Sequence, residues 1–315
     1  MEQPIYNYIF GPVLSSRLGS SLGVDLLGEN ICSFDCLYCE SGKTQIKTMR
    51  RSAYVPCRKV IQELKQWFGQ NEQIEGHITL GGPGEPCLNS ELGEIICSIK
   101  ELRPDLPLAV LTNSSMLVSS QVRAELLKAD VVLPSLDSLV EEEFVRINRP
   151  HPEIRLDNIV QGLLDFKSRF TGKVFLEVLV VPGINDSRKN LELLKDFQGI
   201  LRPDRVDVTT MSRPGSYLDI SECSGSLPDE WRREFRSLPG QKTRQKHKSY
   251  IDGSILRQSI GSSIRRRPQT PEQLAAALGA DLKDILSMLR QMEKAGEVEV
   301  TTKNENRQKF YIIRG

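Results

Sequence analysis

Short apolar segments alternate with amphipathic stretches along the first two thirds of the chain. Buried strands are predicted where the apolar runs are short, at 22–26, 77–80, 107–111, 130–135, 174–181 and 205–210. Helices are predicted where apolar residues recur every three or four positions, at 58–69, 90–101, 119–128, 154–169 and 187–199. Such alternation predicts helices packed on a parallel sheet. We therefore expect an α/β fold, a partial (β/α)6 barrel of the TIM type.

The pattern changes after residue 210. The stretch 237–249 is polar, basic and without apolar periodicity, which predicts a linker. Further on, helical spacing returns at 254–265, Thr270 has the character of an N-cap, and Asp281 opens a helix that ends near Gly296.

The last segments, EVEVTT and KFYII, are predicted to pair as a hairpin across the polar turn KNEN. Three helices followed by a hairpin resemble a winged helix-turn-helix domain. We therefore divide the chain into a barrel (1–236), a basic linker (237–253) and a winged-helix-like domain (254–315).

Composition adds little to this picture. The chain is 39% hydrophobic and 26% charged, with a net charge of +1, as in ordinary globular proteins. No apolar run approaches the roughly 20 residues that span a bilayer, and the first residues lack the basic and apolar segments of a secretory signal. We expect a cytoplasmic protein without a membrane partner.

The cysteines are distributed unevenly. Three of the seven, Cys32, Cys36 and Cys39, fall within eight positions, and an odd total does not suit a disulfide framework. In a reducing compartment such a cluster indicates a metal site. The remaining four show no ligand-like spacing, and each is expected to be a small buried apolar residue: Cys57, Cys87, Cys97 and Cys223.

The spacing C-x3-C-x2-C lets three thiolates of one loop face a single point. Thiolates are the usual ligands of a four-iron cube, so three cysteines leave one iron without a protein ligand. That iron can chelate the amino and carboxylate groups of S-adenosylmethionine, whose S–C5′ bond is then broken by one electron. A structural zinc site is the alternative, but it needs a fourth protein ligand, and no His or further Cys follows before Cys57.

A second signal is the segment Gly81-Gly82-Pro83-Gly84-Glu85-Pro86, which directly follows the predicted strand 77–80. Glycines let the backbone approach a ligand, and Glu85 can receive an ammonium group. The alternative is a tight turn with a surface glutamate. Because barrel enzymes place their chemistry at the carboxyl ends of strands, we favour a cofactor site.

These segments together resemble radical S-adenosylmethionine enzymes, specifically the Fe–S oxidoreductase group related to wybutosine biosynthesis. The resemblance covers about 210 residues, and these segments carry it: GPVLSSRLGSSLGVDLL, CSFDCLYCESGKT, ITLGGPGEP, VLTNSSML, PSLDS, FVRINRPHP and VLVVPGINDS. It implies a [4Fe-4S] cluster on the three cysteines and S-adenosylmethionine as cofactor.

The resemblance also implies roles for individual residues. Tyr38 would lie against the adenine, while Gly82, Gly84 and Glu85 would hold the methionine end of the cofactor. Asn113 would approach the ribose or the carboxylate, Ser135 and Asp137 would line the mouth of the barrel, and the stretch from Val180 to Asn185 would border the adenine. Each position also has a structural interpretation, as a helix cap for Asn113 and Asp137 or as core for Val180.

Two departures from the family pattern matter. Wybutosine-forming enzymes carry further cysteines near the N-terminus for a second cluster, and no cysteine precedes Cys32 here. Cys87 stands where the family pattern leads us to expect Thr, and Cys223 lies in the segment SECSGS. We consider Asp137 and Cys223 as candidate catalytic residues, with a structural role as the alternative for each.

The expected partners are a flavodoxin- or ferredoxin-like electron donor and an RNA or a peptide or protein substrate. The predicted second helix of the tail, DLKDILSMLRQMEKAG, is nearly neutral, which does not favour nucleic-acid reading by that helix. A function of another class stays open, an iron–sulfur regulator that senses redox state and binds DNA.

Overall fold

The computed structural model describes most of the 315-residue chain. The described residues are 6–15, 17–71, 76–211, 215–218, 227–235, 253–266, 268–302 and 309–313. Among them, no helix is both long enough and apolar enough to cross a membrane.

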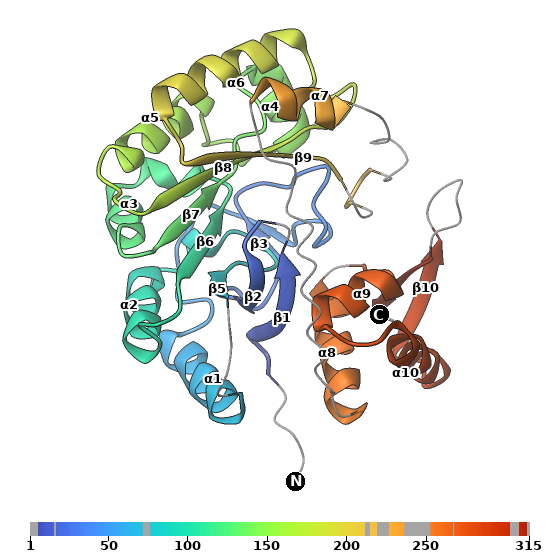
Figure 1. The fold of residues 1–315 in the computed structure, drawn as a ribbon. Helices are drawn as coiled ribbons and strands as arrows, with labels where there is room; N and C mark the ends of the chain where they lie inside the picture. Colours follow the sequence, from blue (N-terminus) through green and yellow to red (C-terminus); the bar gives the residue numbers. More distant parts are fainter. Residues whose placement is uncertain are drawn as a thin grey trace.

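Seven strands form the central sheet (Figure 1). They are β1 (Ile9–Ser15), β2 (Gly19–Val24), β5 (His77–Leu80), β6 (Leu108–Thr112), β7 (Val131–Pro134), β8 (Lys173–Leu179) and β9 (Arg205–Thr209), and they lie side by side in this order. β1 pairs with β2 in antiparallel fashion, whereas every later neighbour is parallel. The six mainly parallel strands predicted from the sequence are confirmed, each within a few residues.

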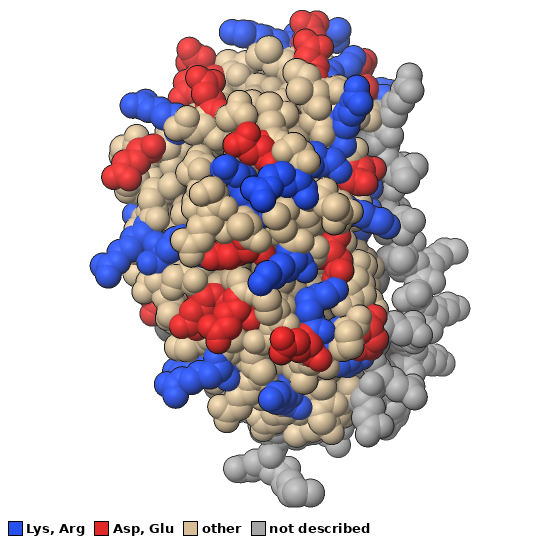
Figure 2. Space-filling model, turned by 90° about the vertical axis from the view of Figure 1, so that its left-hand side faces the viewer, with Lys and Arg blue, Asp and Glu red and all other residues tan. Residues whose placement is uncertain are grey.

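Helices link the parallel strands and cover the outer side of the sheet (Figure 1). On the face of the molecule that Figure 2 shows, basic and acidic side chains are mixed. The bounds of the helices are α1 (Cys57–Gln70), α2 (Leu92–Leu102), α3 (Ser120–Leu126), α4 (Glu141–Asn148), α5 (Leu156–Lys167), α6 (Arg188–Leu201) and α7 (Leu227–Glu234). Each of the five predicted helices is present, and α4 and α7 are additional. Burial of one face explains their positions, since the residues of α1 that are buried, Val60, Leu64 and Trp67, recur at helical spacing.

The tail contains the predicted elements α8 (Gly253–Arg266), α9 (Pro271–Leu278), α10 (Leu282–Lys294), β10 (Val298–Thr302) and β11 (Lys309–Ile313). Thr270 and Gln273 form a capping box on α9, Asp281 caps α10, and the two strands pair in antiparallel fashion. The winged-helix assignment itself stays a prediction. Apart from Gly253, where α8 begins, the proposed linker 237–253 lies outside the described residues.

The apolar side chains of the tail have a core of their own. Leu256, Ile260, Leu274, Leu289 and Tyr311 belong to one buried cluster, separate from the main core under the sheet. Helices α8 and α9 contact β1, at the antiparallel edge of the sheet. The tail is therefore seated beside the barrel through β1, as Figure 1 shows.

Candidate active site

The three clustered cysteines lie on the loop that leaves β2 at the carboxyl end of the parallel strands. Cys32 ends the short strand β3 (Ile31–Cys32), which pairs with β4 (Ile46–Lys47) across the loop. Asn30 closes the loop from inside, because its Nδ2 donates to the carbonyl oxygens of residues 41, 42 and 43 at 3.2, 3.0 and 3.1 Å. The loop is thus held in shape by hydrogen bonds of its own chain.

The sulfur atoms accept N–H groups. Cys32 Sγ accepts from the backbone N–H of Phe34 and from Asn113 Nδ2, both at 3.4 Å, and Cys36 Sγ accepts from Asn148 Nδ2 at 3.5 Å. Burial raises the pKa of the Cys32 thiol to about 12 and raises that of Cys36 well above its ordinary value, and these N–H groups oppose the rise. Donors aimed at sulfur are what an iron–sulfur ligand set uses to tune its cluster.

The possible metal ligands of the loop are its thiolates. Among the described residues, no group of three or more His, Cys, Asp or Glu is placed as a ready site for a metal ion. Three cysteines of one loop, with N–H donors at the sulfurs of Cys32 and Cys36, are the kind of ligand set that holds an iron–sulfur cluster.

The glycine-rich segment after β5 is joined directly to the cysteine loop. Gly84 and Ile31 form a parallel bridge, and the N–H of Glu85 donates to the Ile31 carbonyl oxygen at 3.0 Å. A Cβ on Gly84 would lie 2.0 Å from that same oxygen, and the φ of Gly84 is +100°. Glycine is therefore required here by the close approach of two backbones. Any side chain at position 84 would therefore push the glycine-rich segment away from the cysteine loop.

Glu85 is buried, with 1% of its surface exposed. Its Oε1 accepts from the N–H of Cys87 at 3.0 Å and from the hydroxyl of Thr112 at 2.7 Å, and its Oε2 accepts from the N–H of Asn113 at 2.6 Å. Burial raises the pKa of this carboxyl, and these hydrogen bonds oppose the rise. In this conformation Glu85 therefore joins the ends of β5 and β6.

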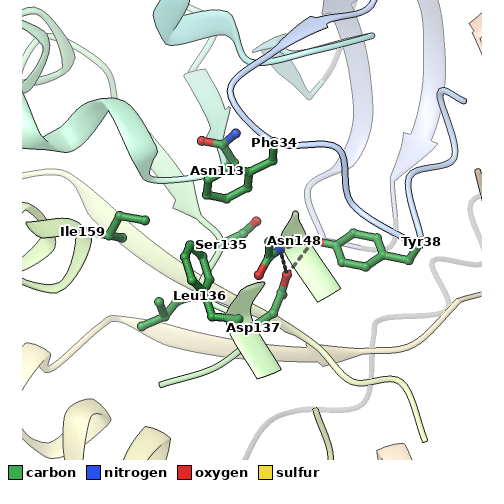
Figure 3. Close-up of a pocket in the computed structure, with 9 residues that line it drawn as sticks. Phe34, Tyr38, Asn113, Ser135, Leu136, Asp137, Asn148 and Ile159 are labelled. Atoms are coloured by element: carbon green, nitrogen blue, oxygen red, sulfur yellow. Dashed lines mark hydrogen bonds between the residues drawn. The ribbon is translucent and has the colours of Figure 1, made fainter. Parts of the chain in front are cut away.

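Four of the predicted site residues line one slot between the cysteine loop and the ends of the strands (Figure 3). They are Tyr38, Asn113, Ser135 and Asp137. The slot measures about 10 Å³, which is room for about one water molecule. Sequence segments that lie up to 99 residues apart are thus brought into contact.

Asp137 organises this slot. Its Oδ2 accepts from the Tyr38 hydroxyl at 2.6 Å and from Asn148 Nδ2 at 2.7 Å, and its Oδ1 accepts from the N–H of Leu179 at 2.9 Å. Figure 3 shows Tyr38 and Asn148 converging on this carboxylate. Because both oxygens are occupied by this chain, Asp137 fixes the orientation of Tyr38 as placed here.

Asn148 is a residue that the sequence analysis missed. It ends α4, and its Nδ2 donates both to Cys36 Sγ and to Asp137, while its carbonyl oxygen accepts from the N–H of Asp35 at 3.1 Å. It therefore ties the cysteine loop to the slot. The only signal was its place in the segment FVRINRPHP, where an asparagine at a helix end has the ordinary meaning of a cap.

A later segment, 215–218, lies against the cysteine loop. Ser216 Oγ donates to the Cys39 carbonyl oxygen at 2.9 Å, the N–H of Tyr217 donates to the Leu37 carbonyl oxygen at 3.1 Å, and the Tyr217 hydroxyl donates to Asp35 at 2.9 Å. The loop is thus bounded by strand ends on one side and by this segment on the other.

The other predicted residues lie as follows. Val180 is fully buried and belongs to the main core, as its structural interpretation expects, and its place beside the adenine stays a prediction. Cys87 is fully buried, with its Sγ 3.5 Å from the Thr112 hydroxyl. Cys223 lies outside the described residues, so its candidate catalytic role stays a prediction.

Comparison with known families matches residues 29–194 to the Radical SAM superfamily. This range contains the cysteine loop, the glycine-rich segment and the slot. Membership implies a [4Fe-4S] cluster and S-adenosylmethionine.

Three relatives are similar in sequence. A protein of Brachyspira hyodysenteriae named GTPase Obg is 31% identical over 92% of this chain and 43% of its own length. UPF0026 proteins of Methanocaldococcus jannaschii and Synechocystis are 32% and 37% identical, over 66% and 65% of this chain and 64% and 76% of their own lengths. The chain thus spans less than two thirds of the first two relatives.

Solved structures are similar in fold. A radical SAM methyltransferase from Sphaerobacter thermophilus superposes with a TM-score of 0.51 at 14% identity, over 70% of this chain and 65% of that one. Streptococcus suis SuiB, bound to the precursor peptide SuiA, gives a TM-score of 0.51 at 16% identity, over 68% of this chain and 45% of that one. From the matched range, the cysteine loop within it and the UPF0026 relatives, this chain belongs to the UPF0026 family of the Radical SAM superfamily, a superfamily of enzymes.

Proposed function

We propose that this chain holds a [4Fe-4S] cluster on Cys32, Cys36 and Cys39 and reductively cleaves S-adenosylmethionine. When bound, the cluster supplies the electron that breaks the S–C5′ bond, which gives methionine and a 5′-deoxyadenosyl radical that abstracts hydrogen from a substrate. The observation that carries the proposal is the direct attachment of the cysteine loop to the glycine-rich segment and to Asn113, since three bonds join them: Glu85 N–H to Ile31 O, Asn113 Nδ2 to Cys32 Sγ and Asn113 Nδ2 to Ser33 Oγ.

The residues of this chain divide the work of holding the cofactor. Gly82 and Gly84 present backbone at the methionine end, and Asn113 is placed between them and the cysteine loop. In the described structure Glu85 Oε2 accepts one hydrogen bond, from Asn113, so a lone pair remains for the ammonium group. Tyr38, held by Asp137, provides a flat face for the adenine, and Ser135 and Val180 border it.

The substrate in this proposal is an RNA or a peptide or protein, and the electron donor is flavodoxin- or ferredoxin-like. We also propose the division into a barrel, a linker and a winged-helix-like domain, and a relation to the wybutosine-forming Fe–S oxidoreductase group. The cytoplasmic location is part of the same proposal. The separate core of the tail supports its treatment as a domain.

The test is product formation. Purified protein, reconstituted without oxygen and reduced with dithionite, is incubated with S-adenosylmethionine, and 5′-deoxyadenosine is quantified by mass spectrometry. We expect stoichiometric or catalytic 5′-deoxyadenosine, and none from Cys36→Ala treated in parallel. A full iron and sulfide content with no 5′-deoxyadenosine would contradict the proposal. Specific DNA retention in that inactive sample would favour the redox regulator instead.

A further inference from the structure

A second hollow lies at the opposite end of the barrel from the cysteine loop. It measures about 900 Å³, within the roughly 300–1,000 Å³ of small-molecule sites. It opens where the parallel strands begin, so its lining includes the first residues of β2, β5, β7, β8 and β9. The slot beside the cysteine loop has nothing like this room.

Three cationic side chains line the hollow: Arg17, Lys173 and Arg205. His77 also lines it, but burial lowers the pKa of His77 and favours its neutral form. The carboxylate in the lining, Asp130, already accepts from Lys100 Nζ at 2.6 and 2.7 Å and from the N–H of Leu108 at 2.7 Å. The charge that the lining offers to a ligand is therefore positive.

The guanidinium groups of Arg17 and Arg205 are held in place by neighbouring side chains and backbone. Arg205 Nε and Nη2 donate to Asp207 Oδ2 at 2.9 and 2.6 Å, Nη2 also donates to the Arg17 carbonyl oxygen at 3.0 Å, and the guanidinium lies 3.8 Å from the centre of the Phe175 ring. Arg17 Nη1 is paired with Glu177. Among the hydrogen bonds of the described residues, none uses Arg205 Nη1. A guanidinium group that is held in a fixed orientation and still has an N–H group without an acceptor can bind a carboxylate or phosphate.

Lys173 completes the arrangement. Its side chain is exposed at the start of β8, and no ion pair of Lys173 occurs among the described residues. A lysine without a carboxylate partner, next to two anchored arginines, leaves a net positive charge at the mouth of the hollow.

The structure assigns to this hollow a site for a phosphate-bearing small molecule, with Arg17, Lys173 and Arg205 around the phosphate. A hollow of this volume has room for a whole small ligand. The site goes beyond the proposed cleavage of S-adenosylmethionine and does not depend on it, because binding is measured with neither that cofactor nor a reductant present.

The experiment is calorimetric titration of the full-length protein with inorganic pyrophosphate and, separately, with a nucleoside triphosphate. The variant Lys173→Gln removes a charge from an exposed position, and Lys189→Gln removes one from the exposed face of α6 as the matched control. We expect saturable binding by the wild type, about tenfold weaker binding by Lys173→Gln because one charge-assisted contact is lost, and no change for Lys189→Gln. Arg205→Lys, which keeps the charge but loses the fork, should also weaken binding.

Competition between pyrophosphate and the nucleoside triphosphate shows which part of the ligand is recognised. If pyrophosphate displaces the triphosphate and Lys173→Gln weakens both, the phosphate group carries the recognition and the assignment is supported. A triphosphate that pyrophosphate cannot displace would show recognition of the nucleoside and would contradict the placement of the three cations around the phosphate. The inference is overturned if neither probe binds more tightly than about 1 mM, or if the two lysine variants bind alike. It is also overturned if a single-stranded RNA binds in a Lys173-dependent manner that neither small anion can displace.

Discussion

The carboxyl and amino ends of the barrel use their polar side chains differently. At the carboxyl end, Asp137 and Glu85 are buried, each carboxylate accepts three hydrogen bonds from this chain, and the slot has room for about one water molecule. At the amino end, arginines paired with carboxylates line a hollow of about 900 Å³. The polar side chains of the carboxyl end fix the cysteine loop in position, whereas the arginines of the amino end border an open space.

The two ends should therefore differ in how much a substitution costs. Groups that hold the cysteine loop are linked to one another by short bonds, so the loss of one leaves buried partners unsatisfied. Charges around the amino-end hollow are partly solvated, so the loss of one costs less.

The largest effect is expected from removal of a cysteine of the loop. Cys36→Ala deletes one of three proposed ligands, so bound iron and sulfide should fall to background and 5′-deoxyadenosine should not form. The measurement is iron and sulfide analysis after anaerobic reconstitution. Cys97→Ala is the control, since Cys97 lies on α2 with its Sγ 3.0 Å from Lys128 Nζ. Equal iron content in both variants would contradict the assignment.

The next effect concerns the contact between the two cofactor segments. Gly84→Ala places a Cβ 2.0 Å from the Ile31 carbonyl oxygen, and strained backbone with overpacking should lower the free energy of unfolding by about 3 kcal/mol. Gly183→Ala is the matched control, because Gly183 also has a positive φ, +71°, but nothing within 4 Å of its added Cβ. It should cost about 1 kcal/mol. Urea unfolding of both variants measures the two losses in free energy of unfolding. Equal losses would contradict the explanation by close contact with Ile31.

A smaller effect is expected at the amino end. Arg17→Gln leaves Glu177 without its partner, and since these side chains are 31% and 11% exposed, the loss should be about 2 kcal/mol rather than the 3–5 of a fully buried pair. The double variant Arg17→Gln with Glu177→Gln should recover about half of it, because no unpaired charge remains. A double-mutant cycle by urea unfolding measures this coupling. Strictly additive losses would show that the pair contributes nothing.

Much of the fold follows from local pattern, and the exceptions have physical reasons. The parallel strands were predicted because burial on both faces makes short continuous apolar runs. β1 was missed because Gly11 and Pro12 interrupt its apolar sequence, and its register indeed shifts between Phe10 and Val13. α4 was missed because it is short, begins with three acidic residues, and buries little more than Phe144 and Ile147.

The site was predictable where chemistry is written in consecutive residues. The cysteine spacing and the glycine-rich segment can each be recognised from a few neighbouring residues. The parallel strands of one sheet then bring both to the same edge. Asn148 was not predictable, because its amide reaches Cys36 across 112 positions of sequence. The hollow at the amino end could not be predicted for the same reason, because Arg17, Lys173 and Arg205 are far apart in sequence and line one hollow only in the folded sheet.

In the proposed function, one iron of the cluster has no cysteine and receives S-adenosylmethionine. The most direct measurement is the electron paramagnetic resonance spectrum of the reduced, reconstituted protein before and after S-adenosylmethionine is added. We expect the g-values of the cluster signal to shift on addition, because the amino and carboxylate groups of the cofactor would bind the iron that lacks a cysteine. Superimposable spectra at saturating S-adenosylmethionine would contradict the claim.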